Sequence, residues 1–149
     1  SVLEDLQSGI CTLAVLPGEQ VPEDYCSVPF LKENLSICVP PGHELAVHTE
    51  LSFAELNGYN FLLGTRLGFW DDMCRENMPA SRFLVQTDQF TMQELIRESS
   101  LPCFVTNLTA EEKETFSDRI VIPITDREAK VMFHLVFKEE NKKYAERFV

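Results

Sequence analysis

The residues best suited to binding chemistry lie in the stretch LLGTRLGFWDD, at positions 62–72. The pattern predicts that a buried strand ends at Gly64 and Thr65 and that a helix begins near Gly68 and Phe69. In open α/β sheets, ligands bind at the carboxyl ends of strands, in the loops that lead into helices. Free backbone N–H groups at this helix start, together with the Thr65 hydroxyl and Arg66, are suited to hold a carboxylate or another anion.

Two aromatic residues, Phe69 and Trp70, follow in the same loop and are suited to wall an apolar pocket. The alternative is an ordinary strand-to-helix loop whose two aromatic side chains pack in the core. A second candidate segment is SLPCFVT, residues 100–106, where Pro102 fixes φ before an extended apolar strand. The alternative there is a plain core strand, and the residues alone leave both alternatives open.

The rest of the chain offers no convincing catalytic or metal-binding motif. Its three histidines stand alone, without a Ser or Cys nucleophile at motif spacing, and its carboxylate pairs read as helix-start charges. No phosphate-binding glycine loop is present. The five cysteines are widely spaced and form no CxxC or Cys/His ligand pair, which argues against zinc and against a redox dithiol. We therefore expect no enzyme activity, no metal and no cofactor.

Composition narrows the class of protein further. A chain of 149 residues with 44% hydrophobic content makes one domain or two small lobes with a real core. Its formal net charge of −11 is repelled by phosphate backbones, so this segment is a poor candidate for contact with nucleic acid. No apolar run approaches the roughly 18 residues that a membrane span needs. The cysteine usage fits a reducing, cytoplasmic compartment.

Strands and helices are expected to alternate along most of the chain, which predicts an α/β fold with mostly parallel sheets flanked by helices. Ser52 and Glu55 form a capping box for a short helix. Helices are predicted at residues 1–9, 52–56, 68–77, 88–100 and 141–149. Strands are predicted at residues 10–17, 59–65, 81–87, 101–107, 120–124 and 131–137, with two strand-like pieces within 25–41.

The order of these elements resembles the effector-binding domain of LysR-type transcriptional regulators, a two-lobed variant of the type 2 periplasmic-binding-protein fold. The matching stretches are LEDLQSGICTLAVLP, VPFLKENLSICVPPGHELA and LSFAELNGYNFLL, and the block ENLSICVPPGHELA is the most specific. Three departures stand out: Thr12 replaces the family's usual aspartate, Glu44 replaces a proline, and SSLPCFVT replaces a glycine-rich segment.

The resemblance implies where the lobes and the effector site lie. Residues 1–31 and 118–149 would form a partial first lobe and residues 32–117 the second lobe, with a return crossover near 105–120. We expect the first lobe to be incomplete and the chain to be N-terminally truncated, without the family's winged helix-turn-helix. The positions that match effector-facing segments of the family are Gly64, Thr65, Arg66, Leu67, Gly68, Phe69, Trp70, Leu16, Pro102, Cys103 and Phe104.

The function implied by the resemblance is that of a bacterial ligand sensor. A small metabolite, plausible as a carboxylate, would bind between the lobes and change how the regulator holds DNA. Partners would be the effector, further copies of the chain in a homodimer or tetramer, and DNA only through the absent N-terminal domain. Two alternatives remain on sequence grounds: a solute-binding protein of a transport system with the same fold, and an enzyme of α/β type.

Overall fold

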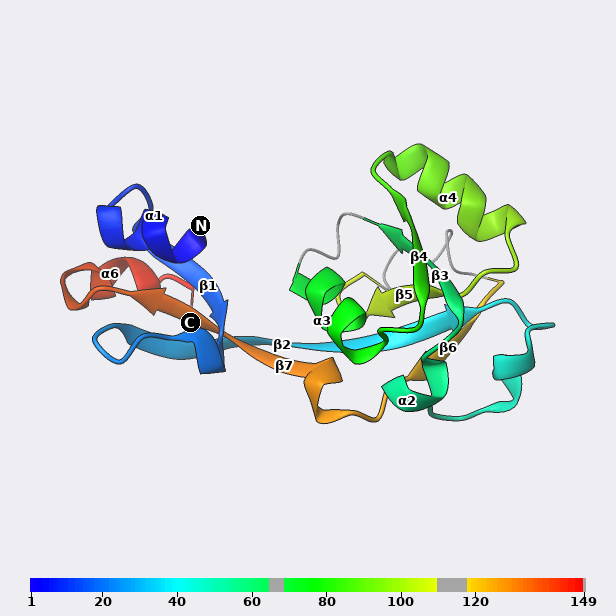
Figure 1. The fold of residues 1–149 in the computed structure, drawn as a ribbon. Coiled ribbons are helices and arrows are strands. Elements are labelled where there is room, and N and C mark those ends of the chain that lie inside the picture. The colour runs from blue at the N-terminus through cyan, green and yellow to red at the C-terminus, as the bar shows by residue number, and fades with distance from the viewer. Residues whose placement is uncertain (65–68, 110–117, 149) are drawn as a thin grey trace. The chain divides into compact units, whose positions relative to one another are not determined.

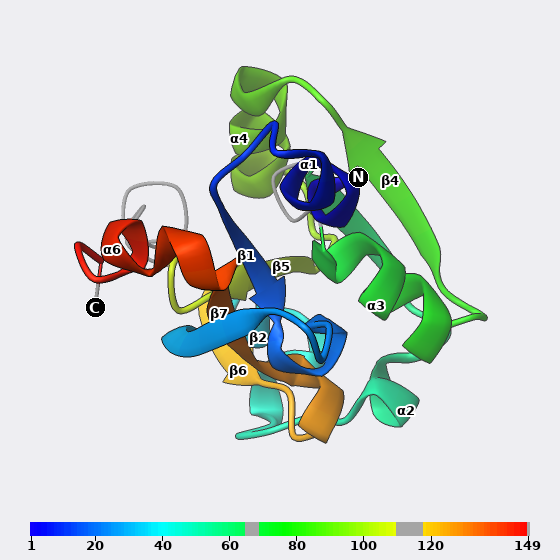
Figure 2. The same ribbon diagram turned by 90° about the vertical axis from the view of Figure 1, so that its left-hand side faces the viewer.

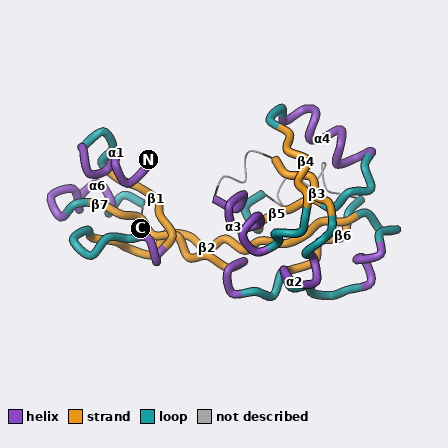
Figure 3. The backbone as a smooth tube through the Cα atoms, in the orientation of Figure 1, coloured by secondary structure: helices purple, strands orange, loops and turns teal. Residues whose placement is uncertain are grey.

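The computed structural model describes residues 1–64, 69–109 and 118–148. The chain divides into two compact units, of which unit 1 comprises Ser1–Glu33 and Lys130–Val149, and unit 2 comprises Asn34–Ala129. Figure 1 labels their helices and strands, and Figure 3 colours them by type. Among the helices of the described residues, none combines the length and the apolar character that crossing a bilayer requires.

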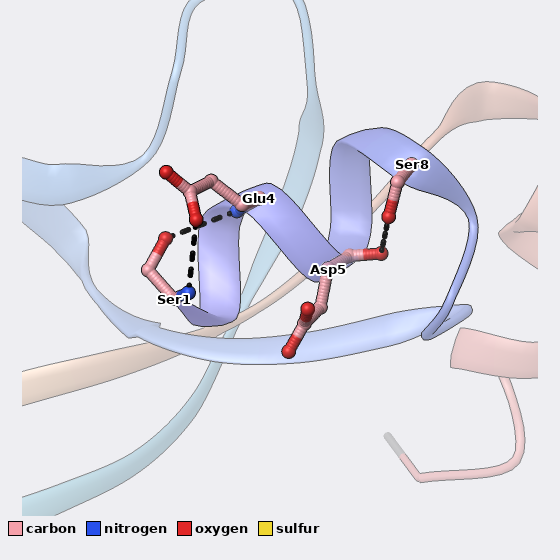
Figure 4. Close-up of polar contacts among 4 residues, drawn as sticks. All are labelled: Ser1, Glu4, Asp5 and Ser8. Carbon is pink, nitrogen blue, oxygen red and sulfur yellow. Dashed lines mark hydrogen bonds and ion pairs between the residues drawn. The ribbon is translucent and has the colours of Figure 1, made fainter.

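Unit 1 begins with helix α1 (Val2–Ser8), whose start and end follow directly from the sequence. The Ser1 hydroxyl accepts a hydrogen bond from the Glu4 N–H at 3.2 Å, and the Glu4 carboxylate accepts one from the Ser1 nitrogen at 3.1 Å (Figure 4). The Ser8 hydroxyl donates to the Asp5 carbonyl. Gly9 then ends the helix at φ 83°, a left-handed conformation that glycine adopts without steric cost.

The sheet of unit 1 contains β1 (Leu13–Pro17), β7 (Lys130–Phe137) and the first part of β2 (Cys26–Val39), in the order β1–β7–β2. Strands β1 and β7 are antiparallel, with Leu13 opposite Phe137. Alternate residues of β7 pack on opposite sides, so α1 covers one face and α6 (Lys142–Ala145) covers the other, as Figure 2 helps to follow. The predicted closing helix is shorter than expected, and its Phe148 is exposed.

Unit 2 holds the second part of β2, together with four further strands in the order β6–β2–β5–β3–β4. These are β3 (Asn60–Gly64), β4 (Arg82–Gln86), β5 (Cys103–Thr106) and β6 (Ile120–Pro123). Its helices are α2 (Phe53–Leu56), α3 (Phe69–Asn77) and α4 (Gln89–Glu98). The capping box of Ser52 and Glu55 is present at the start of α2, as predicted.

Strand direction differs from the sequence prediction in one respect. Strand β3 runs parallel to β4 and β5, as expected for strands joined by helices. Strand β2, however, is antiparallel to both β5 and β6, and β1 is antiparallel to β7. The expectation of mostly parallel sheets is therefore corrected: β2 is one 14-residue strand against which β5 and β6 return, rather than two short pieces.

The placement of β6 also bears on the predicted lobes. Residues 120–123 pair with Ser36–Val39 of β2, so residues 118–129 fall within unit 2. The sequence instead grouped these residues with the first lobe. The assignment of residues 1–31 and 118–149 to one family lobe and of residues 32–117 to the other stays a prediction.

Candidate functional site

A groove of about 810 Å³ lies in unit 2, beside the start of β3. It is lined by residues 42–44 with Pro40, by residues 58–60, and by residues 97–102 at the end of α4. The predicted anion loop lies at the other end of β3, after Gly64. Of the described site residues that the sequence singled out, the groove includes only Pro102.

Several polar side chains of this groove already have partners within unit 2. His43 accepts a hydrogen bond at Nδ1 from the Leu45 N–H, at 3.1 Å, and so caps the turn that follows it. Tyr59 bonds to the Glu44 carboxylate, which raises the pKa of the Tyr59 hydroxyl. The Arg97 guanidinium pairs with Glu94 at 3.2 Å. The lining holds one arginine, Arg97, beside two glutamates, Glu44 and Glu98, so its charges do not favour an anion.

At the predicted anion loop, the structure describes the residues on either side. Gly64 ends β3 opposite Gln86 of β4, and a Cβ built on Gly64 would lie 3.8 Å from Met92 Cε, an ordinary contact. Phe69 and Trp70 begin α3 with their ring centroids 5.2 Å apart at 75°. Trp70 is only 2% exposed and belongs to the core. Thr65, Arg66, Leu67 and Gly68 lie outside the described residues.

The other predicted residues are buried. Leu16 packs in unit 1 against Leu6, Ala14 and Val136. In unit 2, the Pro102 carbonyl accepts a hydrogen bond from Leu62 N at 2.8 Å. The side chains of Cys103 and Phe104 point to opposite faces of the sheet, and the Phe104 ring lies 4.9 Å from that of Phe61. Their buried side chains therefore shape the core, and only backbone groups of these segments are suited to meet a ligand.

Comparison with known proteins identifies the class of domain. A sequence model of the LysR substrate binding domain matches residues 1–149, the whole chain. The chain belongs to this family. A comparison with curated protein sequences found no significant match.

Solved structures show the same fold as this LysR substrate-binding domain at low sequence identity. The regulatory domain of MetR, a LysR family regulator from N. meningitidis, has a TM-score of 0.76 at 12% identity over 99% of this chain and 71% of its own. The CcmR regulatory domain of Synechocystis PCC6803, solved with 2-PG, gives 0.67 at 16%, over 99% and 76%. Full-length CbnR, solved with its target DNA, gives 0.67 at 16%, over 99% and 56%. The predicted two-lobed periplasmic-binding-protein-like class is thus confirmed.

The sequence reasoning missed Arg119, a half-buried residue of this LysR substrate-binding domain. Its side chain holds the end of α4 and the segment that follows α4. Its guanidinium donates to the carbonyls of Ile96 and Ser99 at the end of α4, at 3.0 and 2.8 Å. It also donates to the carbonyls of Leu101 and Cys38, at 2.8 and 3.1 Å. An arginine at a helix C-terminus satisfies the last carbonyls and complements the helix dipole. No local pattern signals this role, because every one of these carbonyls lies at least 18 residues away in sequence.

Proposed function

We propose that this LysR substrate-binding domain senses a small metabolite of the carboxylate class. The effector would bind in the cleft between the two lobes and change how a winged helix-turn-helix domain outside residues 1–149 holds its DNA target. The observation that carries the proposal is the family match over the whole chain. Two relatives of the same fold support its parts, since CcmR was solved with 2-PG and CbnR with its target DNA.

The proposed effector contacts come from the loop after β3. Gly64 ends that strand, and the residues that follow, Thr65 and Arg66, supply a hydroxyl and a planar guanidinium suited to a carboxylate. The predicted wall consists of Phe69 and of the backbone near Leu16 and Pro102. A ligand shifts a conformational equilibrium only by its difference in affinity for the two states. Contacts made from both lobes at once provide that difference.

The proposed partners follow from the same assignment. We assign DNA contact to the winged helix-turn-helix domain outside residues 1–149, since a net charge of −11 in these residues repels a phosphate backbone. The regulator would work in the cytoplasm as a homodimer or tetramer formed through this domain. Its proposed role is that of a sensor, in line with the family match, which is to a substrate-binding domain. Within the described residues no group of three or more His, Cys, Asp or Glu side chains is arranged to hold a metal ion.

Calorimetric titration of the chain with a panel of mono-, di- and phosphorylated carboxylates tests the proposal. We expect one class to bind and the Arg66→Ala variant to bind it about 10- to 100-fold more weakly, the effect of losing a charge-assisted hydrogen bond. Arg82→Ala is the matched control, because Arg82 is an exposed arginine on β4. Equal affinities of the two variants would exclude the loop after β3 as the anion site. Binding of neutral sugars or amines alone would exclude the carboxylate class.

A further inference from the structure

Two cysteines that are far apart in sequence face each other in unit 2. Cys38 on β2 and Cys103 on β5 are register partners in an antiparallel pair. Both side chains are fully buried and share a cluster with Leu62, Ile96 and Val105 beneath α4. The sequence argued against a redox dithiol because no two cysteines are closely spaced. That argument considered spacing along the chain only, whereas strand pairing brings these two together.

The register fixes the separation of the two backbones. Asn107 N donates to Asn34 O at 3.3 Å, which makes that facing pair a hydrogen-bonded one. Hydrogen-bonded and non-bonded pairs alternate along an antiparallel ladder, and Cys38 and Cys103 lie four positions along from it. Facing Cα atoms at such positions are about 5.5 Å apart, inside the roughly 4.4–6.8 Å that a disulfide bond spans.

The surroundings favour a thiolate at this pair of sulfurs, because a guanidinium lies beside it. The hydrogen bond from Cys103 lowers the pKa of the Cys38 thiol; burial opposes this, and the nearby Arg119 charge adds to the lowering. The same hydrogen bond, together with burial, raises the pKa of Cys103. Arg119 Nη1 lies 3.7 Å from Cys103 Sγ. The described residues offer Arg119 only neutral acceptors, so its charge favours a thiolate beside it.

The other cysteines lack this arrangement. Cys74 is as deeply buried, but burial raises the pKa of its thiol to about 12. Cys26 is partly exposed and donates to Glu139 Oε2 at 2.8 Å, which raises its pKa. If burial alone decided the reaction with peroxide, Cys74 would react like the facing pair. If exposure alone decided it, Cys26 would react in preference to the pair.

We propose that Cys38 and Cys103 form a reversible disulfide bond when hydrogen peroxide oxidises them. The Cys38 thiolate attacks one peroxide oxygen, and the hydroxide that leaves takes a proton to become water. Cys38 is then a sulfenic acid. The Cys103 sulfur attacks the Cys38 sulfur and expels a second hydroxide, which takes the Cys103 proton. Two thiols and one peroxide thus give one disulfide and two waters.

The geometry also makes the bond easy to reduce. Facing Cβ atoms in a sheet are about 4.5–5.5 Å apart, wider at hydrogen-bonded pairs, whereas disulfides prefer roughly 3.5–4.5 Å. The strands must draw together by about 1 Å, and disulfides held away from their preferred geometry are the reducible ones. Because both sulfurs are covered, peroxide reaches them through local opening of α4, and the reaction is slower than at an exposed thiol.

The test exposes the intact chain to hydrogen peroxide without denaturant, blocks the remaining thiols with N-ethylmaleimide and analyses an unreduced digest by mass spectrometry. We expect a peptide that links Cys38 to Cys103, lacks two hydrogens and disappears on treatment with reduced glutathione. Cys74 is the matched internal control, because it is equally buried and should keep its thiol. This measurement requires no substitution, so it does not depend on how a variant folds.

Two variants identify the attacking sulfur. In Cys103→Ser, whose hydroxyl keeps a hydrogen-bond donor beside Cys38, dimedone should trap a sulfenic acid at Cys38, whereas in Cys38→Ser it should trap none at Cys103. A linked peptide that forms only after denaturation would overturn the proposal. So would N-ethylmaleimide adducts at both Cys38 and Cys103 under conditions where peroxide has fully oxidised Cys11 and Cys26. Trapping at Cys103 in place of Cys38 would overturn the assignment of the nucleophile.

Discussion

Replacing Arg119 tests whether one guanidinium holds the end of α4 to the sheet of unit 2. Arg119→Met keeps the length of the side chain and removes four hydrogen bonds to carbonyls, made at 2.8 to 3.1 Å. Hydrogen bonds to a charged group contribute roughly 1.5–3 kcal/mol each. Their sum overestimates the loss for two reasons. Burying part of the guanidinium costs desolvation energy, and water can still reach the exposed part. We expect a net loss of about 3 kcal/mol in the free energy of unfolding.

Urea denaturation followed by tryptophan fluorescence measures this loss where it should occur. Trp70 is the single tryptophan of the chain and is buried in unit 2, so its emission reports on that unit. A loss of 3 kcal/mol moves the midpoint down by about 1–2 M urea for a unit of this size. Arg119→Lys keeps the charge but not the planar fork, and we expect about half the effect.

Arg82→Met provides the control, because Arg82 is an exposed arginine of the same unit, on strand β4. A surface change of this kind should alter the free energy of unfolding by less than about 0.5 kcal/mol. If Arg119→Met behaves like Arg82→Met, the network around the end of α4 contributes little and the reasoning is refuted. A large effect of Arg119→Lys equal to that of Arg119→Met would mean that hydrogen-bond geometry, not charge, dominates.

Three further outcomes are expected. Gly18→Ala should destabilise the protein by about 1–3 kcal/mol in thermal or urea unfolding, because the new Cβ would lie 2.9 Å from His134 Nε2. The control Gly42→Ala should leave stability unchanged, because nothing lies within 4 Å of its new Cβ. Adding His134→Ala to Gly18→Ala should recover stability, because it removes the ring that the new Cβ meets. Asp126→Ala should cost about 1–2 kcal/mol, since Asp126 Oδ1 accepts from the first N–H of α2 at 2.7 Å; no change in unfolding would show that this bond is replaced by water. The hydrogen bonds of Thr91, through its side chain and then its N–H, lower the pKa of Asp88 below its usual 3.8. The Asp88 carboxylate therefore stabilises the fold above that value and loses its effect as the pH falls through the folded pKa, so Asp88→Asn should flatten the stability profile on that acidic side, and an unchanged profile would contradict this.

Local signals predicted the short elements well. The predicted capping box of Ser52 and Glu55 begins α2, and the helix predicted at residues 1–9 ends at Gly9. Such signals act over three or four residues, so they survive in any tertiary context. The strand at Asn60–Gly64 was visible as an apolar run bounded by polar residues.

Long-range pairing was beyond the same reasoning. The antiparallel partners of β2, the position of β6 in unit 2, the acceptors of Arg119 and the facing cysteines all join residues many positions apart. Periodicity reports which face of a strand is buried but not which strand lies beside it. The predicted anion loop stays a prediction. Side-chain chemistry singled out Thr65 and Arg66, and both lie outside the described residues.

The discontinuity of unit 1 has a consequence for the order of folding. Unit 2 is one continuous stretch, Asn34–Ala129, and can complete its own contacts before residues 130–149 are made. Unit 1 cannot, because β1 must wait for β7, and Leu13 pairs with Phe137. In a flexible chain that closure carries the entropic cost of a loop of more than about one hundred residues. During synthesis from the N-terminus, unit 2 is therefore the natural nucleus, and unit 1 is completed only when residues 130–149 have followed.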